Sequence, residues 1–276
     1  MMSLNNLHTN LDGFANSERM PVLFLGHGNP MNAIEENQFV EGFRNLAKTL
    51  PRPNAILCIS AHWYINGTKV TAMKTPPTIH DFGGFPRELY EVQYLAQGSP
   101  ELANETKQLL SPALVELDQK WGLDHGAWSV IKHLYPAADV PVIELSIDYT
   151  KSPDYHYELA KQLGSLRDKG ILIIGSGNIV HNLGLVDWAN FDRDDYGLDW
   201  AKEAKETINK WILDGNYQSI IQYKNQIRAI QLAVPTPDHY LPLIYTLGLK
   251  SETDNIELFN DKMVAGSLSM TSLKIS

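Results

Sequence analysis

Two histidines stand directly after short apolar runs, which makes them the first candidates for chemistry in this sequence. His27 follows the run Val22-Leu-Phe-Leu-Gly26, and His62 follows Ala55-Ile-Leu-Cys-Ile-Ser-Ala61. An almost unbroken apolar run of this length is typical of a strand buried on both faces of a sheet. Open α/β sheets bind ligands at their carboxyl edge, and neighbouring strands lie about 5 Å apart. We therefore expect the two imidazoles to be close enough to share one metal ion.

Three further histidines have comparable settings. His181 lies just beyond the apolar run Ile171 to Gly177, whereas His239 and His125 stand at the entrance to segments of helical character. None of them forms the His-x-x-x-His pair of a helical zinc protease. The pattern predicts a metal site assembled from separate elements at one rim of the sheet. Histidines that only make structural hydrogen bonds are the alternative interpretation.

Strand-like and helix-like segments alternate along the chain. Beyond the two runs described above, the predicted strands are Lys69 to Met73, Leu114 to Leu117, Val140 to Ile147, Ile171 to Gly177, Asn255 to Phe259 and Gly266 to Ile275. The predicted helices are Asn37 to Leu50, Pro100 to Leu110, Asp124 to Leu134, Ser152 to Lys169, Asp199 to Leu213, Tyr217 to Tyr223 and Tyr240 to Leu247. The last strand alternates polar and apolar residues, so we expect it at an antiparallel edge. This order predicts one α/β domain with helices on both faces of the sheet.

Composition restricts the classes of function. The chain has 276 residues, 43% hydrophobic and 20% charged, with a net charge of -9. Acidic charge argues against a nucleic-acid partner, and no apolar run has the length of a membrane span. Residues 1–19 are polar and are expected to form a flexible leader before a catalytic domain at 20–276. The single cysteine, Cys58, lies within a predicted buried strand and suits a reducing cytoplasm.

A long segment from Thr75 to Tyr90 holds three prolines, paired glycines and two phenylalanines. It is too long and too aromatic for a simple connection. We predict that Phe82 and Phe85 line a substrate pocket. A surface loop packed on its own side chains is the alternative.

Six motifs occur in an order that resembles a known family. They are Gly26-His-Gly-Asn-Pro30, Ser60-Ala-His-Trp63, Asp81-Phe-Gly-Gly-Phe-Pro86 with Glu88-Leu-Tyr90, Leu123-Asp-His-Gly-Ala-Trp128, His181-Asn-Leu183 and Pro235-Thr-Pro-Asp-His239. Together they resemble the DOPA 4,5-extradiol dioxygenases of the class III extradiol ring-cleaving dioxygenase superfamily. The resemblance covers nearly everything after about Met20.

The resemblance implies a three-layer α/β/α sandwich with a mostly parallel central sheet. It also implies that His27, His62 and His239 bind a divalent metal. His181 matches the histidine that acts as acid and base, with a role as fourth metal ligand as the alternative. His125 matches a catalytic histidine that lies against the substrate. The implied reaction inserts both atoms of O₂ into a catechol, DOPA-like substrate. Fe(II) is expected for activity, although three neutral imidazoles also make a good zinc site, so isolated protein could carry Zn(II).

Two other functions stay open from the residues alone. One is a zinc-dependent hydrolase that uses a metal-bound hydroxide, with His181 as the base. The other is a non-catalytic binding protein on the same scaffold. The sequence does not indicate the natural catechol, the ring bond that opens or the number of chains that assemble.

Overall fold

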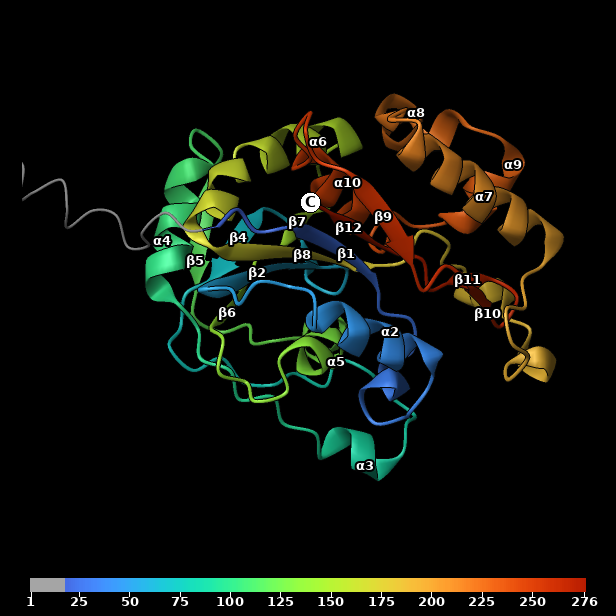
Figure 1. The fold of residues 1–276 in the computed structure, drawn as a ribbon, viewed down its shortest axis with the longest axis horizontal. Coiled ribbons are helices and arrows are strands. Elements are labelled where there is room, and N and C mark those ends of the chain that lie inside the picture. The colour runs from blue at the N-terminus through green and yellow to red at the C-terminus, as the bar shows by residue number, and fades with distance from the viewer. Residues whose placement is uncertain (1–17) are drawn as a thin grey trace, which may run out of the picture.

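The computed structural model describes residues 18–276, and a six-stranded sheet forms its centre (Figure 1). The strand order is β6 (Val142–Glu144), β2 (Ala55–Ser60), β8 (Ile171–Gly177), β1 (Val22–Gly26), β12 (Ser272–Ile275) and β9 (Ile256–Phe259). The first four strands are parallel, whereas β12 is antiparallel to both of its neighbours. The prediction of a mostly parallel sheet is therefore confirmed. Most of the predicted leader, residues 1–19, lies outside the described residues.

Alternate side chains of the central strands enter two separate cores. Val22 and Phe24 of β1 pack on one face, and Leu23 and Leu25 pack on the other. Helices α6 (Pro153–Lys161), α7 (Asp199–Leu213) and α10 (Leu241–Gly248) cover the first face. Helices α2 (Gln38–Ala47) and α5 (His125–Leu134) cover the second. The sheet therefore lies between two helical layers, as the three-layer prediction requires (Figure 1).

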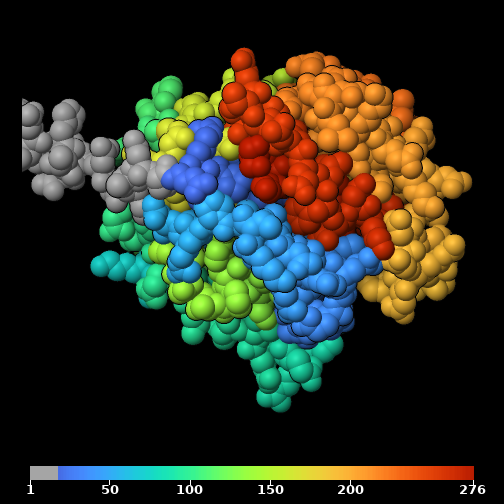
Figure 2. Space-filling model, in the orientation of Figure 1, coloured from blue at the N-terminus to red at the C-terminus, as the bar shows by residue number. Residues whose placement is uncertain are grey.

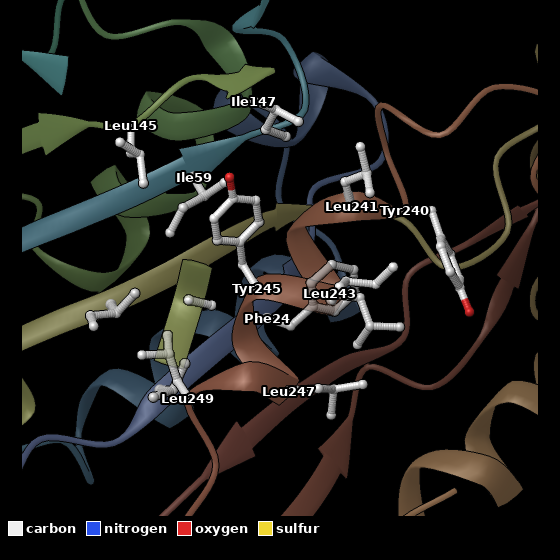
Figure 3. Packing of buried hydrophobic residues seen from close by; sticks show 14 of the residues in the cluster. Phe24, Ile59, Leu145, Ile147, Tyr240, Leu241, Leu243, Tyr245, Leu247 and Leu249 are labelled. Atoms are coloured by element: carbon white, nitrogen blue, oxygen red, sulfur yellow. The ribbon is translucent and has the colours of Figure 1, made fainter. Parts of the chain in front are cut away.

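Helix α10 lies deep in the first core and exposes almost no surface to solvent. All eight of its residues are buried. Figure 3 shows Leu243 and Tyr245 of this helix beside Phe24 of β1 and Ile59 of β2. Burial of large apolar side chains like these stabilises a fold by about 1.5–3 kcal/mol each. This packing fixes the start of α10, which lies next to His239.

The remaining elements surround these layers. The short strands are β3 (Tyr64–Ile65), β4 (Thr68–Thr71), β5 (Val115–Asp118), β7 (Ile147–Asp148), β10 (Met263–Val264) and β11 (Leu268–Ser269). The other helices are α3 (Arg87–Tyr90), α4 (Pro100–Leu109), α8 (Tyr217–Ile221) and α9 (Arg228–Ala233). The short 3-10 helices are η1 (Pro30–Ala33), η2 (Gly164–Lys169), η3 (Leu183–Leu185), η4 (Trp188–Asn190) and η5 (Tyr223–Asn225).

The prediction that the last strand lies at the edge of the sheet is wrong. β12 pairs with β1 on one side and with β9 on the other, so β9 is the edge strand. The polar residue Ser272 is buried because its Oγ accepts a hydrogen bond from the Gly26 amide at 2.9 Å and donates one to the Met270 carbonyl at 3.0 Å. Polar residues in this strand therefore do not mark a solvent-facing side.

The predicted strand Val140 to Ile147 is interrupted. β6 ends at Glu144, and β7 begins at Ile147 and pairs with β3 instead of the central sheet. Between them the Leu145 amide donates to the Cys58 carbonyl and the Ser146 amide to the Lys69 carbonyl, both at 2.8 Å. The chain thus changes partners within two residues. The predicted helix Ser152 to Lys169 is likewise divided, into α6 and η2.

Cys58 is buried in the middle of β2, as predicted. Burial, followed by the nearby carboxyl groups of Glu144 and Asp124, raises the pKa of its thiol well above the usual value. Such a thiol is a small apolar side chain and not a nucleophile. Among residues 18–276, no helix combines the length and apolar content needed to cross a bilayer.

Candidate metal centre

Five histidines converge at the carboxyl edge of the parallel strands. His27 follows β1, His62 follows β2, and His181 lies a few residues beyond β8. His125 is the first residue of α5, and His239 immediately precedes Tyr240, the N-cap of α10. β8 lies between β1 and β2 in the sheet, so the loops after all three strands begin side by side. The sequence prediction that these histidines meet at one rim is confirmed.

The rings of His27, His62 and His239 form a nearly equilateral triangle. Their centroids are 5.1 Å apart for His27 and His62, 5.1 Å for His27 and His239, and 5.0 Å for His62 and His239. The Nε2 atoms of His27 and His62 are 3.3 Å apart. Two nitrogens bound to one tetrahedral zinc ion at about 2.05 Å would be separated by about 3.3 Å. The spacing of these two nitrogens therefore fits a shared ion.

Ser176 of β8 fixes the tautomer of His27. Its Oγ lies 2.9 Å from His27 Nδ1 and donates its own proton to the Gly126 carbonyl at 2.5 Å. The hydroxyl must therefore accept a hydrogen bond from Nδ1–H. A neutral imidazole carries one proton, so Nε2 of His27 has a free lone pair. The Ser176 hydroxyl thus leaves the inward nitrogen available to a metal.

The Asp81 carboxylate lies beside the Nδ1 atoms of two other histidines. One carboxylate oxygen lies 2.9 Å from His125 Nδ1 and accepts a hydrogen bond from the His125 amide at 2.9 Å. The other lies 3.4 Å from His62 Nδ1. Burial raises the pKa of Asp81, but hydrogen bonds from His125 outweigh it and the net pKa is lowered. The carboxylate is thus charged and favours a proton on His125 Nδ1, whereas His62 Nε2 is within hydrogen-bond distance of His27 Nε2.

The Nε2 atoms of His27 and His62 form an N–H···N hydrogen bond, in which His62 Nε2 can donate to the free lone pair of His27 Nε2. Burial, followed by the neighbouring histidines, lowers the pKa values of both rings well below the usual value, so neither ring carries a second proton. A divalent cation bound between the two nitrogens would take the place of this shared proton. The donor set, neutral imidazoles whose second nitrogen is held by a hydroxyl or carboxylate, is the one that transition metals prefer.

Two further histidines are candidates for the third ligand. The ligand nitrogens of His27, His62 and His125 all lie within 4.8 Å of one another. His239 completes the triangle of rings, and its Nδ1 is bonded to the Asp238 carboxylate, which leaves its Nε2 free. Burial raises the pKa of Asp238, but the hydrogen bond from His239 outweighs it and lowers the net value. His27 and His62 belong to both sets.

His181 stacks on His239. The ring centroids are 3.6 Å apart and the planes differ by 6°. Burial, followed by the neighbouring His239, lowers the pKa of His181 to about 3. Its ring nitrogens make no hydrogen bond among the described residues, so the neutral ring has a free lone pair. The lone pair is open to a proton or to a metal, and the lowered pKa means that the ring gives up an accepted proton readily.

Phe82 lies against the histidine cluster and Phe85 lies behind it. The Phe82 ring meets His125 edge-on with centroids 5.4 Å apart, and Phe85 packs on Phe82 at 5.4 Å. Tyr90 and Trp128 also contact the Phe82 ring. Of the two predicted substrate residues, Phe82 alone contacts a histidine of the centre. Phe82 and the rings packed on it therefore form an aromatic surface beside His125, which we call the aromatic wall.

Two buried carboxyl groups support the start of α5. Asp124 caps the helix by accepting from the Ala127 amide at 3.0 Å, and the same oxygen accepts from Ser60 Oγ at 2.6 Å. Glu144 accepts from the Asp124 amide at 2.9 Å. Burial is the main cause that raises the pKa of each acid. The nearby Asp124 carboxyl raises the pKa of Glu144 further, whereas a hydrogen bond with Glu144 partly lowers the pKa of Asp124. This pair ties the end of β2 to the first turn of α5 and so fixes His62 relative to His125.

The histidine prediction missed the residues that orient the rings. Ser176, Asp81 and Asp238 all contact a ring nitrogen of the cluster. Asp238 could have been found because it directly precedes His239, and Asp81 because it begins the motif Asp81-Phe-Gly-Gly-Phe-Pro86. Ser176 is 149 positions from His27, and no local signal connects them.

A parallel-sheet sandwich with a histidine-lined centre at its carboxyl edge defines a metal-dependent α/β enzyme, and sequence comparison assigns the family. Residues 21–272 match the model of the catalytic LigB subunit of aromatic ring-opening dioxygenase. The chain belongs to this family. It is an extradiol ring-cleaving dioxygenase.

The individual relatives agree. The chain is 45% identical to the 4,5-DOPA dioxygenase extradiol of Escherichia coli K12 over 268 residues, which cover 96% of this chain and 97% of the relative. It is 36% identical to the Beta vulgaris protein of the same name over 92% of this chain and 96% of the relative. A crystal structure of an uncharacterized Escherichia coli K12 protein superposes with a TM-score of 0.81 at 41% identity and covers 94% of this chain and 100% of that one.

These findings confirm the family resemblance, the fold class and the enzyme class predicted from the sequence. They favour a dioxygenase over the zinc hydrolase and the binding protein. The family uses a metal cofactor and acts on a small aromatic substrate with O₂.

Proposed function

We propose that the chain cleaves the ring of a DOPA-like catechol and that Fe(II) is its active metal, held by His27, His62 and His239. The relatives named 4,5-DOPA dioxygenase extradiol support the substrate class. The facing Nε2 atoms of His27 and His62, 3.3 Å apart, are the observation that carries the metal assignment. His239 is favoured over His125 as third ligand because its ring is equally distant from the other two.

When bound, Fe(II) supplies a redox-active Lewis acid at which catechol and dioxygen meet, whereas Zn(II) has no redox chemistry. Three neutral imidazoles leave the full positive charge of the ion uncompensated. This charge favours a catechol that has lost a proton. Zinc binds such a site more tightly than iron does, so we expect zinc-loaded protein to be inactive.

His181 is the proposed acid–base residue. Its ring is neutral at neutral pH, and neither of its nitrogens is engaged by a described residue. It can therefore accept the proton of a catechol hydroxyl at its free nitrogen and return it later. Its stacking on His239 fixes the plane of the ring. A role as fourth ligand is the competing assignment.

His125 and the aromatic wall hold the substrate in this proposal. The Asp81 carboxylate lies 2.9 Å from His125 Nδ1 and favours a proton there, so Nε2 of that ring remains for contact with the substrate. Phe82 lies edge-on to His125 and, backed by Phe85, presents an apolar surface to the catechol ring. We also place the protein in the cytoplasm, because its single buried thiol suits a reducing compartment.

The test is anaerobic reconstitution with Fe(II), followed by oxygen uptake and visible absorption with DOPA and simple catechols. We expect one O₂ consumed per catechol, a yellow product from iron-loaded protein, and no reaction from zinc-loaded protein. His62→Ala, loaded in the same way, is the negative control. Iron-loaded protein that consumes no oxygen with any catechol would refute the proposal.

A further inference from the structure

A cavity of ≈ 370 Å³ is lined in part by Gly28 and Asn29, the residues that follow His27, and the proposed mechanism does not use it. Its walls come from the segment after His27, the start of α2, the segment 191–195 and the C-terminal hairpin β10–β11. Gln38 donates to Asp194 at 2.6 Å across this junction. Figure 2 shows the blue segment near residue 40 and the yellow segment near residue 190 meeting at the surface, with the red C-terminal segment beside them.

Two walls of the cavity are attached to histidines of the centre. Gly28, which lines it, directly follows His27, and the Asn32 side chain donates to the His27 carbonyl at 3.0 Å. On the other side, Leu268 forms a β-bridge with His181. The cavity therefore adjoins the site at which the catechol is expected to bind.

Most of the lining is apolar or already engaged. The apolar part includes Met31, Phe39, Phe191, Met263 and Met270. The amide side chain of Asn37 caps α2, and Gln38 is bonded to Asp194. A ligand therefore meets a mainly apolar wall with few open amides.

The charged lining contains two free acids. Asp194 is paired with Lys262, and Asp195 accepts from the Met263 amide. Arg193, the one cation among the described lining residues, lies over the Tyr196 ring at 4.9 Å from its centroid. Within residues 18–276, the side-chain carboxylates of Glu35 and Asp192 have no hydrogen-bond or ion-pair partner. These two carboxylates are the unpaired negative charges of the cavity.

We propose that this cavity binds the side arm of the aromatic substrate and that Glu35 and Asp192 favour an arm ending in an ammonium group. The inference rests on the proposed catechol cleavage. The volume falls in the range of small-molecule pockets, and an unsubstituted catechol would leave it unfilled. Apolar walls suit the carbon chain of an arm, and the free carboxylates suit a cationic end and oppose an anionic one.

The test compares three catechols that share the ring and differ in the arm. They are catechol itself, 4-(2-aminoethyl)catechol with a cationic arm, and 3-(3,4-dihydroxyphenyl)propanoate with an anionic arm. For each variant, kcat/KM for an armed catechol is divided by the value for catechol. Dissociation constants measured anaerobically give the same ratios without turnover.

Two substitutions probe the cavity. Glu35→Gln should lower the ratio for the cationic arm by about two- to fivefold, as expected for one partly exposed ion pair. Val264→Trp, which places a large ring in the cavity wall, should lower the ratios for both arms at least about tenfold, because a filled pocket excludes the arm. Glu252→Gln, an exposed acid in the loop between α10 and β9, is the matched control and should change neither ratio.

The outcomes separate this inference from the proposed function. Unchanged ratios in both Glu35→Gln and Val264→Trp would refute the side-arm site even if every catechol is cleaved. An equal decrease in Glu252→Gln would also refute it, because the effect would then be one of net charge. If wild-type protein cleaves no catechol, the proposed function fails, and the anaerobic binding ratios still decide whether the cavity accepts the arm.

Discussion

Ser176→Ala should weaken metal binding although Ser176 is not a ligand. The substitution removes the acceptor for His27 Nδ1–H and the donor to the Gly126 carbonyl, both in a fully buried position. Without this acceptor, nothing favours the tautomer of His27 that carries its proton on Nδ1. A fraction of the protein would carry it on Nε2, the nitrogen that faces His62.

The expected magnitude follows from the two hydrogen bonds of the Ser176 hydroxyl. A buried polar group left without its partner costs about 1–3 kcal/mol. Removing the partner that orients a metal-bound histidine typically reduces metal affinity by about 10–100-fold, which corresponds to about 1.4–2.8 kcal/mol. We expect the dissociation constant for Zn(II) or Co(II), measured by competition with a chelator, to rise within that range. Melting temperatures of the metal-free protein report any decrease in fold stability separately.

Ser129→Ala is a matched control for this measurement. Ser129 is also a buried serine, on α5, but its hydroxyl has no hydrogen-bond partner within residues 18–276. Removing it should leave the metal affinity within about twofold of wild type, because it orients no ligand. If Ser176→Ala binds metal as tightly as Ser129→Ala, the tautomer argument for His27 is wrong.

Three further predictions concern the proposed base His181, the buried His156 and the buried ion pair between Asp254 and Arg167. His181→Ala should keep most of its iron while turnover falls about 10²-fold or more; metal content and oxygen uptake on one sample check this, and a parallel decrease of both would make His181 a ligand. Burial lowers the pKa of His156 to about 4, so the unfolded chain binds a proton there that the folded chain does not. The free energy of unfolding should then fall by up to about 3 kcal/mol as the pH drops from about 6.5 to 4; urea melts should show a shallower pH slope in His156→Gln, and equal slopes would contradict the assignment. Asp254→Ala leaves the buried Arg167 guanidinium unpaired, at a cost of about 3–5 kcal/mol; the melting temperature should fall while the metal affinity of the folded protein stays unchanged.

The part of the site that could be predicted from the sequence is the part that depends on strand ends. The runs before His27 and His62 are apolar at nearly every position because both faces of β1 and β2 are covered by helices. Since parallel strands end at the same edge, a histidine after each run is placed near its counterpart without knowledge of the tertiary structure. The same reasoning applied to His181, because β8 is an equally apolar strand.

The sequence could not reveal that Ser176 holds the second nitrogen of His27. The contact between His27 and Ser176 joins positions 149 apart, and β8 brings them together only because it inserts between β1 and β2. The central position of β12 was missed for a related reason. Its buried Ser272 is satisfied by Gly26 of the neighbouring strand, so the polar residue carries no information about exposure.

The histidines alone therefore do not define this centre. Each imidazole has two nitrogens, and a chain that left them free would present a mixture of tautomers to the ion. Here a hydroxyl holds Nδ1 of His27, one carboxylate faces Nδ1 of His62 and His125, and another holds Nδ1 of His239. Because the orienting partners come from β8 and from two separate loops, the inward direction of the Nε2 lone pairs is a property of the assembled fold. It follows that relatives which keep the histidines but lose Ser176 or Asp81 should bind metal more weakly than their histidine content suggests.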